Sequence, residues 1–233
     1  MPQQWLSQWA IHKQGMVENS DIQSLIHDLA AIEPPGSDVF NQYQADANPN
    51  NALRRANFTL YLQNIAQRQS KTLLVMEAPG YRGSRLTGVP VTSRKVLLEG
   101  IPSLNLFGAD NGFQNVTDTG FEHIYSEQSA TIVWNTLADL RHVPLIWNTF
   151  PFHPHEIEKP LTNRRPRKHE TELGSLFLQR IIDLFTPKMV IAVGNVAHET
   201  LAEIGIESTK IRHPAQGGKN DFVAGLTALL ERD

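Results

Sequence analysis

Three polar side chains of types used in catalysis each stand at the end of a short apolar run: Glu77, Asn148 and His213. A carboxylate can stabilise a sugar that carries positive charge, or orient a water that attacks it. A carboxamide offers both a donor and an acceptor, so it can read the edge of a nucleobase. An imidazole can stabilise the charge that develops on a departing group. If the fold brings them together, these three side chains would give one pocket an acid, an amide and an imidazole.

The elements that must position these residues are four short hydrophobic strands separated by helices. The strands are expected at Leu73–Met76, Pro144–Asn148, Met189–Val193 and Thr209–Arg212. The helices are expected at Arg94–Leu98, Ser129–Leu140, Glu170–Phe185, Asn195–Ile204 and Phe222–Leu230. Strands that are apolar throughout and alternate with helices indicate a parallel sheet covered on both faces, a three-layer α/β/α fold. The carboxyl ends of such strands share one edge of the sheet, where ligand sites gather.

The first 70 residues are expected to be helical. Trp5, Leu6 and Trp9 share a helical face, and a second helix should run from the cap at Ser20 to Ile32. After a polar loop at Asp38–Asn51, a further helix is expected over Ala52–Gln69. We therefore predict an N-terminal helical extension over residues 1–70, packed on an α/β domain over residues 71–233.

Composition excludes several classes of protein. The 233 residues contain no cysteine, so disulfides, iron–sulfur clusters, thiolate zinc sites and cysteine nucleophiles are ruled out. The formal net charge of -3 argues against a chain that is basic throughout, so any binding to nucleic acid must use a local patch. No apolar run resembles a signal peptide or a membrane span, and we expect a cytoplasmic protein without membrane contact.

One dense basic run, Arg164–His169, has two interpretations. It is either a solvated loop or a set of phosphate contacts to DNA, which would be independent of sequence. Other polar and basic residues are expected along the same edge: Tyr81, Arg82, Arg85, Ser93, Arg94, Lys95 and Lys219.

A second cluster, His153, His155 and Glu156, offers ligand types that bind metals. It leaves open a metal-dependent hydrolase. No second group completes the coordination, so we predict neither a metal nor another cofactor.

Five short motifs in this order resemble the uracil-DNA glycosylase superfamily, most of all its bacterial and archaeal iron–sulfur class. They are Met76-Glu77-Ala78-Pro79-Gly80, Asn163-Arg164-Arg165-Pro166, Pro187-Lys188, Val193-Gly194-Asn195-Val196-Ala197 and His213-Pro214. The resemblance covers Lys71–Asp233 and implies a four-stranded sheet in the order 2-1-3-4. It also implies a monofunctional glycosylase that flips a damaged base out of DNA and hydrolyses its glycosidic bond with water.

The resemblance implies a role for each site residue. Glu77 would act on the water or the sugar cation, Asn148 would read the base, and His213 would stabilise the departing base. The base-binding set would be Ala78, Pro79, Gly80, Tyr81, Val91, Asn148 and Phe150. The DNA-binding set would be Arg85, Ser93, Asn163, Arg164, Arg165, Gln216 and Lys219. The partner would be DNA that contains uracil or another deaminated base, bound by a monomer.

The chain also departs from the pattern of that class. It lacks the cysteines of the cluster, and Val91 stands where the class has an aromatic residue that stacks on the base. Gln216 follows His213-Pro214 where the class places an apolar residue that fills the vacated stack. These departures keep open a second hypothesis, a protein of glycosylase fold that binds nucleic acid with little or no catalysis.

Overall fold

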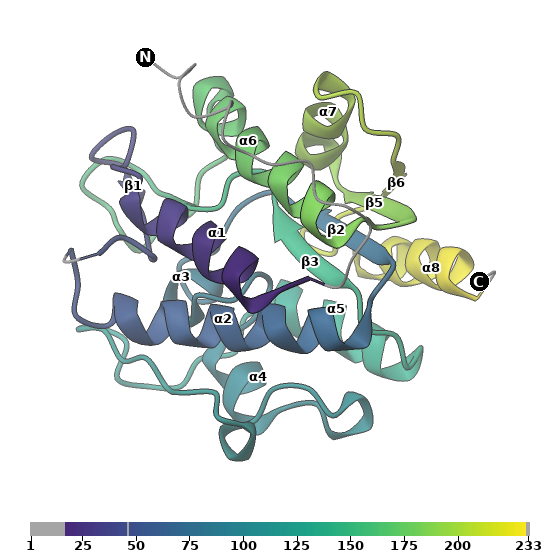
Figure 1. Ribbon diagram of the computed structural model, residues 1–233, viewed down its shortest axis with the longest axis horizontal. Coiled ribbons are helices and arrows are strands. Elements are labelled where there is room, and N and C mark those ends of the chain that lie inside the picture. The colour runs from purple at the N-terminus through teal and green to yellow at the C-terminus, as the bar shows by residue number, and fades with distance from the viewer. Residues whose placement is uncertain (1–16, 46, 232–233) are drawn as a thin grey trace.

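A computed structural model describes residues 17–45 and 47–231 of the chain, and its centre is a parallel sheet (Figure 1). The strands are β2 (Thr72–Met76), β3 (Leu145–Asn148), β5 (Met189–Val193) and β6 (Thr209–Ile211), in the order β3-β2-β5-β6. All three pairings are parallel. The predicted strands and the order 2-1-3-4 are confirmed.

Helices cover both faces of this sheet and confirm the three layers. The helices α6 (Lys168–Phe185) and α7 (Asn195–Glu203) pack together, as do α5 (Gln128–Asp139) and α8 (Lys219–Leu230). Figure 1 shows α6 and α7 above the sheet, and α5 and α8 below it. The connection from β2 to β3 leads toward one edge of the sheet, and the connections from β3 to β5 and from β5 to β6 lead toward the other edge. Right-handed crossovers therefore place the connecting helices on opposite faces.

The helices α1 (Asn19–Ala31) and α2 (Asn51–Arg68) share one hydrophobic core with the sheet. Along α2, the hydroxyl of Tyr61 accepts the backbone N–H of Ile146 at 2.8 Å, and the ring of Phe58 stacks on Trp147. Both partners belong to β3, so α2 covers the edge that this strand leaves unpaired. The division of the chain at residue 70 stays a prediction, and the helix expected at Trp5–Trp9 lies outside the described residues.

The sequence did not predict a two-stranded antiparallel sheet, in which β1 (Val39–Phe40) pairs with β4 (His153–Pro154). Strands of two residues have no periodicity that a sequence pattern can show. This small sheet ties the loop before α2 to the loop after β3. Between β2 and α5 the chain forms the short helices α3 (Ser84–Thr87), α4 (Arg94–Glu99), η2 (Pro102–Leu104) and η3 (Ala109–Asn111).

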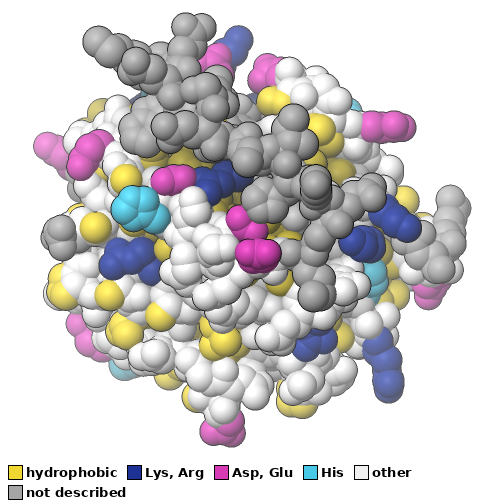
Figure 2. Space-filling view, viewed as in Figure 1, with side chains coloured by type: hydrophobic (Ala, Val, Ile, Leu, Met, Phe, Trp, Pro, Cys, Tyr) yellow, Lys and Arg dark blue, Asp and Glu magenta, His cyan; other side chains and the backbone are white. Residues whose placement is uncertain are grey.

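Charged side chains of both signs are interspersed on the face shown in Figure 2, without a broad patch of one sign. Among the described helices, none combines the length and the apolar character that crossing a membrane requires.

Candidate active site

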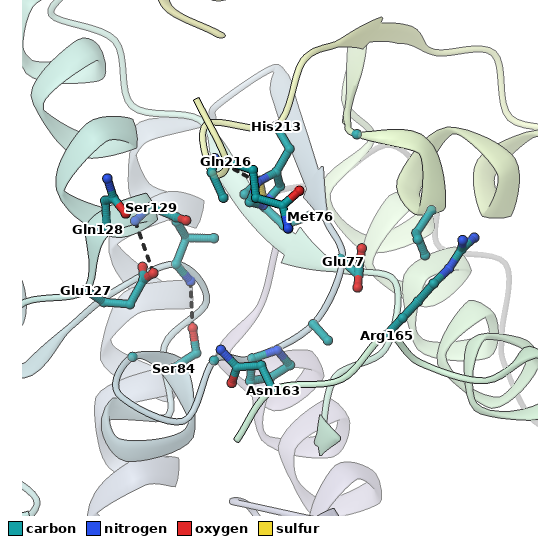
Figure 3. Close-up of a pocket in the computed structure, with 18 of the residues that line it drawn as sticks. Met76, Glu77, Ser84, Glu127, Gln128, Ser129, Asn163, Arg165, His213 and Gln216 are labelled. Carbon is teal, nitrogen blue, oxygen red and sulfur yellow. Dashed lines mark hydrogen bonds between the residues drawn. The ribbon is translucent and has the colours of Figure 1, made fainter. Parts of the chain in front are cut away.

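A cleft of about 760 Å³ opens at the carboxyl ends of β2, β5 and β6. Glu77 and His213 both line it, as the strand-end argument predicted (Figure 3). Figure 3 shows Glu77 and Arg165 on one side of the cleft, Ser84 and Glu127 on the opposite side, and His213 with Gln216 between them. The remaining lining residues are Met76, Ala78, Pro79, Gly80, Gly83, Val91, Gln128, Ser129, Asn163, Arg164, Gly194, Asn195, Val196, Lys210, Ile211, Arg212 and Ala215.

Glu77 follows β2 directly and is half-buried in the cleft. Burial raises the pKa of its carboxyl group, and the nearby Arg165 guanidinium opposes that rise. The backbone carbonyl of Glu77 accepts hydrogen bonds from the Thr149 hydroxyl at 2.7 Å and from the Phe150 N–H at 3.1 Å. The loop after β3 therefore fixes the backbone that presents this carboxylate.

The ring of His213 is held in one orientation by its own loop. Its Nδ1 accepts the backbone N–H of Ala215 at 3.1 Å, so the proton of the neutral ring lies on Nε2. Burial and the Arg212 charge lower the pKa of His213, which favours that neutral ring. A neutral imidazole with an Nε2–H is a hydrogen-bond donor for an anion formed in the cleft.

Gly194, at the end of β5, packs against His213 and has a backbone conformation that favours glycine. A Cβ built on Gly194 would lie 3.4 Å from Cβ of His213, and the backbone φ of 92° strains any other residue.

The turn that follows Glu77 is fastened from two sides by the long loop after β3. The buried His153 ring donates from Nδ1 to the Pro79 carbonyl at 2.8 Å, because only the nitrogen can donate in this pair. The side chain of Asn163 accepts the N–H of Tyr81 at 2.9 Å. Burial lowers the pKa of His153 to about 4, so its ring is neutral at physiological pH. His153 therefore supports the cleft from behind and does not line it.

The opposite wall contains a strained residue. Val91 has a φ of 51°, in the left-handed region that a β-branched residue rarely adopts. Its N–H donates to Ser84 Oγ at 2.8 Å and its carbonyl accepts from Trp134 Nε1 at 2.7 Å. These two side chains hold Val91 in a conformation that costs about 1–3 kcal/mol. Strain of this kind gathers at functional sites, and Val91 lines the cleft.

Three predicted base-binding residues do not line the cleft: Phe150, Tyr81 and Asn148. Phe150 is fully buried with its ring edge-on to Phe152, so it is not a stacking partner for a base in this structure. Its backbone packs under α6, where a Cβ on Gly174 would lie 2.9 Å from the Phe150 Cα. Tyr81 lies at the rim, with its ring edge-on to Phe121.

Asn148 is at the end of β3, beside Met76 in the sheet. Its side chain is buried, and Oδ1 has no hydrogen-bond partner among the described residues. It does not line the cleft, although its sheet neighbour Met76 does. The role of Asn148 in reading a base stays a prediction.

Two residues expected at the DNA surface, Arg85 and Ser93, are buried in this structure. The guanidinium of Arg85 lies 3.3 Å from the Asp118 carboxylate, inside the protein. The hydroxyl of Ser93 accepts the N–H of Val96 and caps α4. Neither side chain is available to a phosphate in this structure.

Part of the basic run is structural. Arg164 donates to both carboxylate oxygens of Glu170, at 2.6 and 2.7 Å, and also pairs with Asp38 at 3.1 Å. Arg167 binds Asp38 too, and these contacts lower the pKa of Asp38 to about 2. Only Arg165 of the three is an exposed guanidinium at the cleft, where it pairs with Glu199 at 3.0 Å. Lys219 is exposed at the start of α8, away from the cleft lining.

Several lining residues were missed from the sequence. Lys210 and Arg212 flank the end of β6, so the strand-end rule that selected His213 would also have found them. Ser84 and Glu127 gave no such signal, because they lie in segments without periodicity. Glu127 caps α5 by accepting the N–H groups of Ser129 and Ala130.

The histidine-rich segment after β3 does not assemble a metal site in this structure. The Nδ1 atoms of His153 and His155 each bond a backbone carbonyl. Within the part of the chain that the structure describes, no three or more His, Cys, Asp or Glu side chains form a group that could hold a metal ion.

Comparison with known proteins identifies the class to which this fold and site belong. The sequence profile described as "Uracil DNA glycosylase superfamily" matches residues 63–227. The chain belongs to the uracil-DNA glycosylase superfamily, whose members are DNA glycosylases, hydrolases of base excision repair that act on DNA.

A solved structure similar to this chain is that of wild-type SMUG2 from Pedobacter heparinus. It is 13% identical, with a TM-score of 0.58 over 91% of this chain and 97% of that one, a likeness that supports the fold. A search of curated protein sequences finds no significant match.

Proposed function

We propose that this protein is a monofunctional DNA glycosylase that removes uracil or another deaminated base and leaves an abasic site. The observation that carries the proposal is the presence of Glu77 and His213 in one cleft, at the carboxyl ends of β2 and β6. Membership of a glycosylase superfamily supports the same reaction. We further propose that the protein acts in the cytoplasm, as a monomer and without a cofactor.

In the proposed reaction the base is flipped into the cleft and its bond to the sugar breaks. Glu77, ionised, faces the cationic sugar or orients the attacking water. His213 donates from Nε2 to the departing base, which leaves as an anion. Water supplies the hydroxyl that replaces the base at the sugar carbon, and its remaining proton neutralises the base. No lysine Schiff base is required.

A second candidate is a protein that binds a flipped base with little catalysis. The aliphatic Val91 favours it, because an isopropyl group stacks on a base more weakly than a ring does. The buried position of Asn148 behind the cleft favours it as well.

One experiment separates the candidates. Oligonucleotides that contain uracil, hypoxanthine or xanthine are incubated with the protein in EDTA and then treated with alkali. Strand breaks that survive EDTA and vanish in His213→Ala support the glycosylase. Tight binding without breaks supports the second candidate. Breaks abolished by EDTA and restored by zinc or manganese would contradict both, in favour of a metal-dependent hydrolase.

A further inference from the structure

The wall of the cleft opposite Glu77 carries polar side chains that have no role in the proposed bond cleavage. Ser84 and Glu127 lie on this wall, across the cleft from Glu77 (Figure 3). In the proposed reaction Glu77 faces the sugar, so a base that extends across the cleft brings its far edge to the opposite wall. Asn148, which was expected to read that edge, does not line the cleft. The far edge of a bound base therefore meets Ser84 and Glu127.

Glu127 is fixed in the cleft as a hydrogen-bond acceptor. Its Oε1 accepts the N–H of Ser129 at 3.0 Å, and its Oε2 accepts the N–H of Ala130 at 2.6 Å. Its stem packs on Gly83, where a Cβ would lie 3.3 Å from Cγ of Glu127. A carboxylate has about four acceptor positions and no donor. Two backbone groups therefore hold this carboxylate in place and leave it able to accept a hydrogen bond from a ligand.

Ser84, the residue after Gly83, supplies the opposite polarity. Its Oγ accepts the N–H of Val91 at 2.8 Å, and among the residues that the structure describes the hydroxyl makes no other hydrogen bond. Ser84 keeps only 5% of its surface exposed, yet it lines the cleft. A hydroxyl that already accepts one hydrogen bond still has a proton to donate. The wall thus presents a free donor at Ser84 and an acceptor at Glu127.

A donor and an acceptor on one wall complement a lactam, in which a ring N–H adjoins a carbonyl. Uracil has this group at N3–H and O4, and hypoxanthine and xanthine have it at N1–H and O6. Cytosine and adenine present the reverse order, a ring nitrogen that accepts and an amino group that donates. A carboxylate that faces such a ring nitrogen meets a lone pair, which weakens binding.

We infer that Glu127 is the specificity-determining residue of the cleft. Its carboxylate accepts the lactam N–H of the flipped base, while the Ser84 hydroxyl donates to the adjacent carbonyl. The inference rests on the proposed function in placing a base in the cleft. The same two groups serve pyrimidine and purine lactams, so one wall admits uracil, hypoxanthine and xanthine and disfavours the amino bases.

The test measures binding rather than cleavage. Fluorescence anisotropy gives the Kd of two oligonucleotides of the same sequence, which carry a non-hydrolysable 2′-fluoro analogue of either deoxyuridine or 3-methyldeoxyuridine. Methylation of N3 removes the lactam proton. The wild type should therefore bind the methylated oligonucleotide at least about tenfold more weakly, as expected for the loss of a hydrogen bond to a charged group. Glu127→Ala removes both the acceptor and its bulk, so this variant should bind the two oligonucleotides alike.

Glu127→Asp is the second variant, because aspartate is a preferred N-cap that keeps α5 capped while its side chain is one methylene shorter. It should also distinguish the two oligonucleotides less than the wild type does. The matched control is Glu122→Ala. It removes an exposed carboxylate that accepts the N–H of Gly120 at 2.9 Å and does not line the cleft, so it should keep the wild-type ratio of Kd values. Melting curves establish that each variant is folded.

A wild type that does not distinguish the two oligonucleotides would overturn the inference, and so would a distinction that persists in both Glu127 variants. If the distinction depends on Glu127 but the wild type releases no base from any substrate, the proposed function fails and the inference stands. If base is released and the distinction does not depend on Glu127, the inference alone fails.

Discussion

The Nε1 of Trp134 donates to the carbonyl oxygen of Val91 at 2.7 Å, and so joins α5 to the strained wall of the cleft. Ser84 holds the N–H of the same residue. The strain at Val91 is a property of its backbone. Substitution there should therefore reverse the usual order of stability of alanine and glycine variants.

Val91→Gly should be more stable than Val91→Ala by about 1 kcal/mol, because glycine adopts a positive φ without steric cost. In most positions alanine is the more stable of the two. Chemical denaturation of both variants measures the difference. Val196→Gly and Val196→Ala, at a similarly buried lining residue inside α7, are the matched pair and should show the ordinary order. If the alanine variant were more stable than the glycine variant at both positions, the strain at Val91 would be contradicted. Both Val91 variants remove the wall and should lower base release about tenfold, or about 1.4 kcal/mol.

A second prediction concerns Arg165 and the pH dependence of base release. Burial raises the pKa of Glu77 and the charge of Arg165 lowers it. The proposed reaction needs Glu77 as a carboxylate, so base release is lost as the pH falls through the pKa of Glu77. Arg165→Gln removes the opposing charge and should move the acidic limb of the pH–rate profile to higher pH.

The control is Lys168→Gln, which removes an exposed cation at the start of α6. Its acidic limb should stay at the wild-type pH. An unmoved limb in Arg165→Gln, or equal shifts in both variants, would show that Arg165 does not tune Glu77.

A third prediction concerns His153 and stability. Its pKa falls from about 6.5 in the unfolded chain to about 4 in the fold, so the folded protein keeps the ring neutral. Between these two values the unfolded state binds a proton that the folded state does not. Stability should therefore decrease as the pH falls from 6.5 to 4, by about 3 kcal/mol in total from this residue.

His153→Gln retains a donor for the Pro79 carbonyl and removes the titration. The free energy of unfolding, measured at several pH values, should fall less steeply in the variant than in the wild type. Parallel curves for the two proteins would contradict the prediction.

The sequence predicted the sheet well because its strands are short, apolar and separated by helices of clear periodicity. The rule that ligand sites gather at the carboxyl ends of parallel strands selected Glu77 and His213, and both line one cleft. The burial of Phe150 and of Arg85, which the sequence did not predict, has a common physical cause. The backbone of Phe150 packs against α6, and the Arg85 side chain pairs with the loop that carries Asp118. Both partners are distant in sequence, and a local pattern does not contain that information.

A sequence pattern could not predict the wall of the cleft formed by Ser84, Val91 and Glu127, for a related reason. Its geometry depends on side chains that bind backbone groups across the fold, such as Trp134 with Val91. The basic run was ambiguous in sequence, and the structure divides it. Arg164 and Arg167 anchor a loop on Asp38, while Arg165 faces the cleft.

The central claim is that Glu77 and His213 hydrolyse a glycosidic bond in this cleft, and it is tested most directly by detecting the released base. Single-turnover reactions with uracil-, hypoxanthine- and xanthine-containing oligonucleotides, in EDTA, are analysed for free base by mass spectrometry. The account predicts free base in amounts equal to the abasic sites formed, with release slowed at least about a hundredfold in folded His213→Ala and Glu77→Gln. No release from any of the three substrates, or release unchanged in both variants, would contradict it.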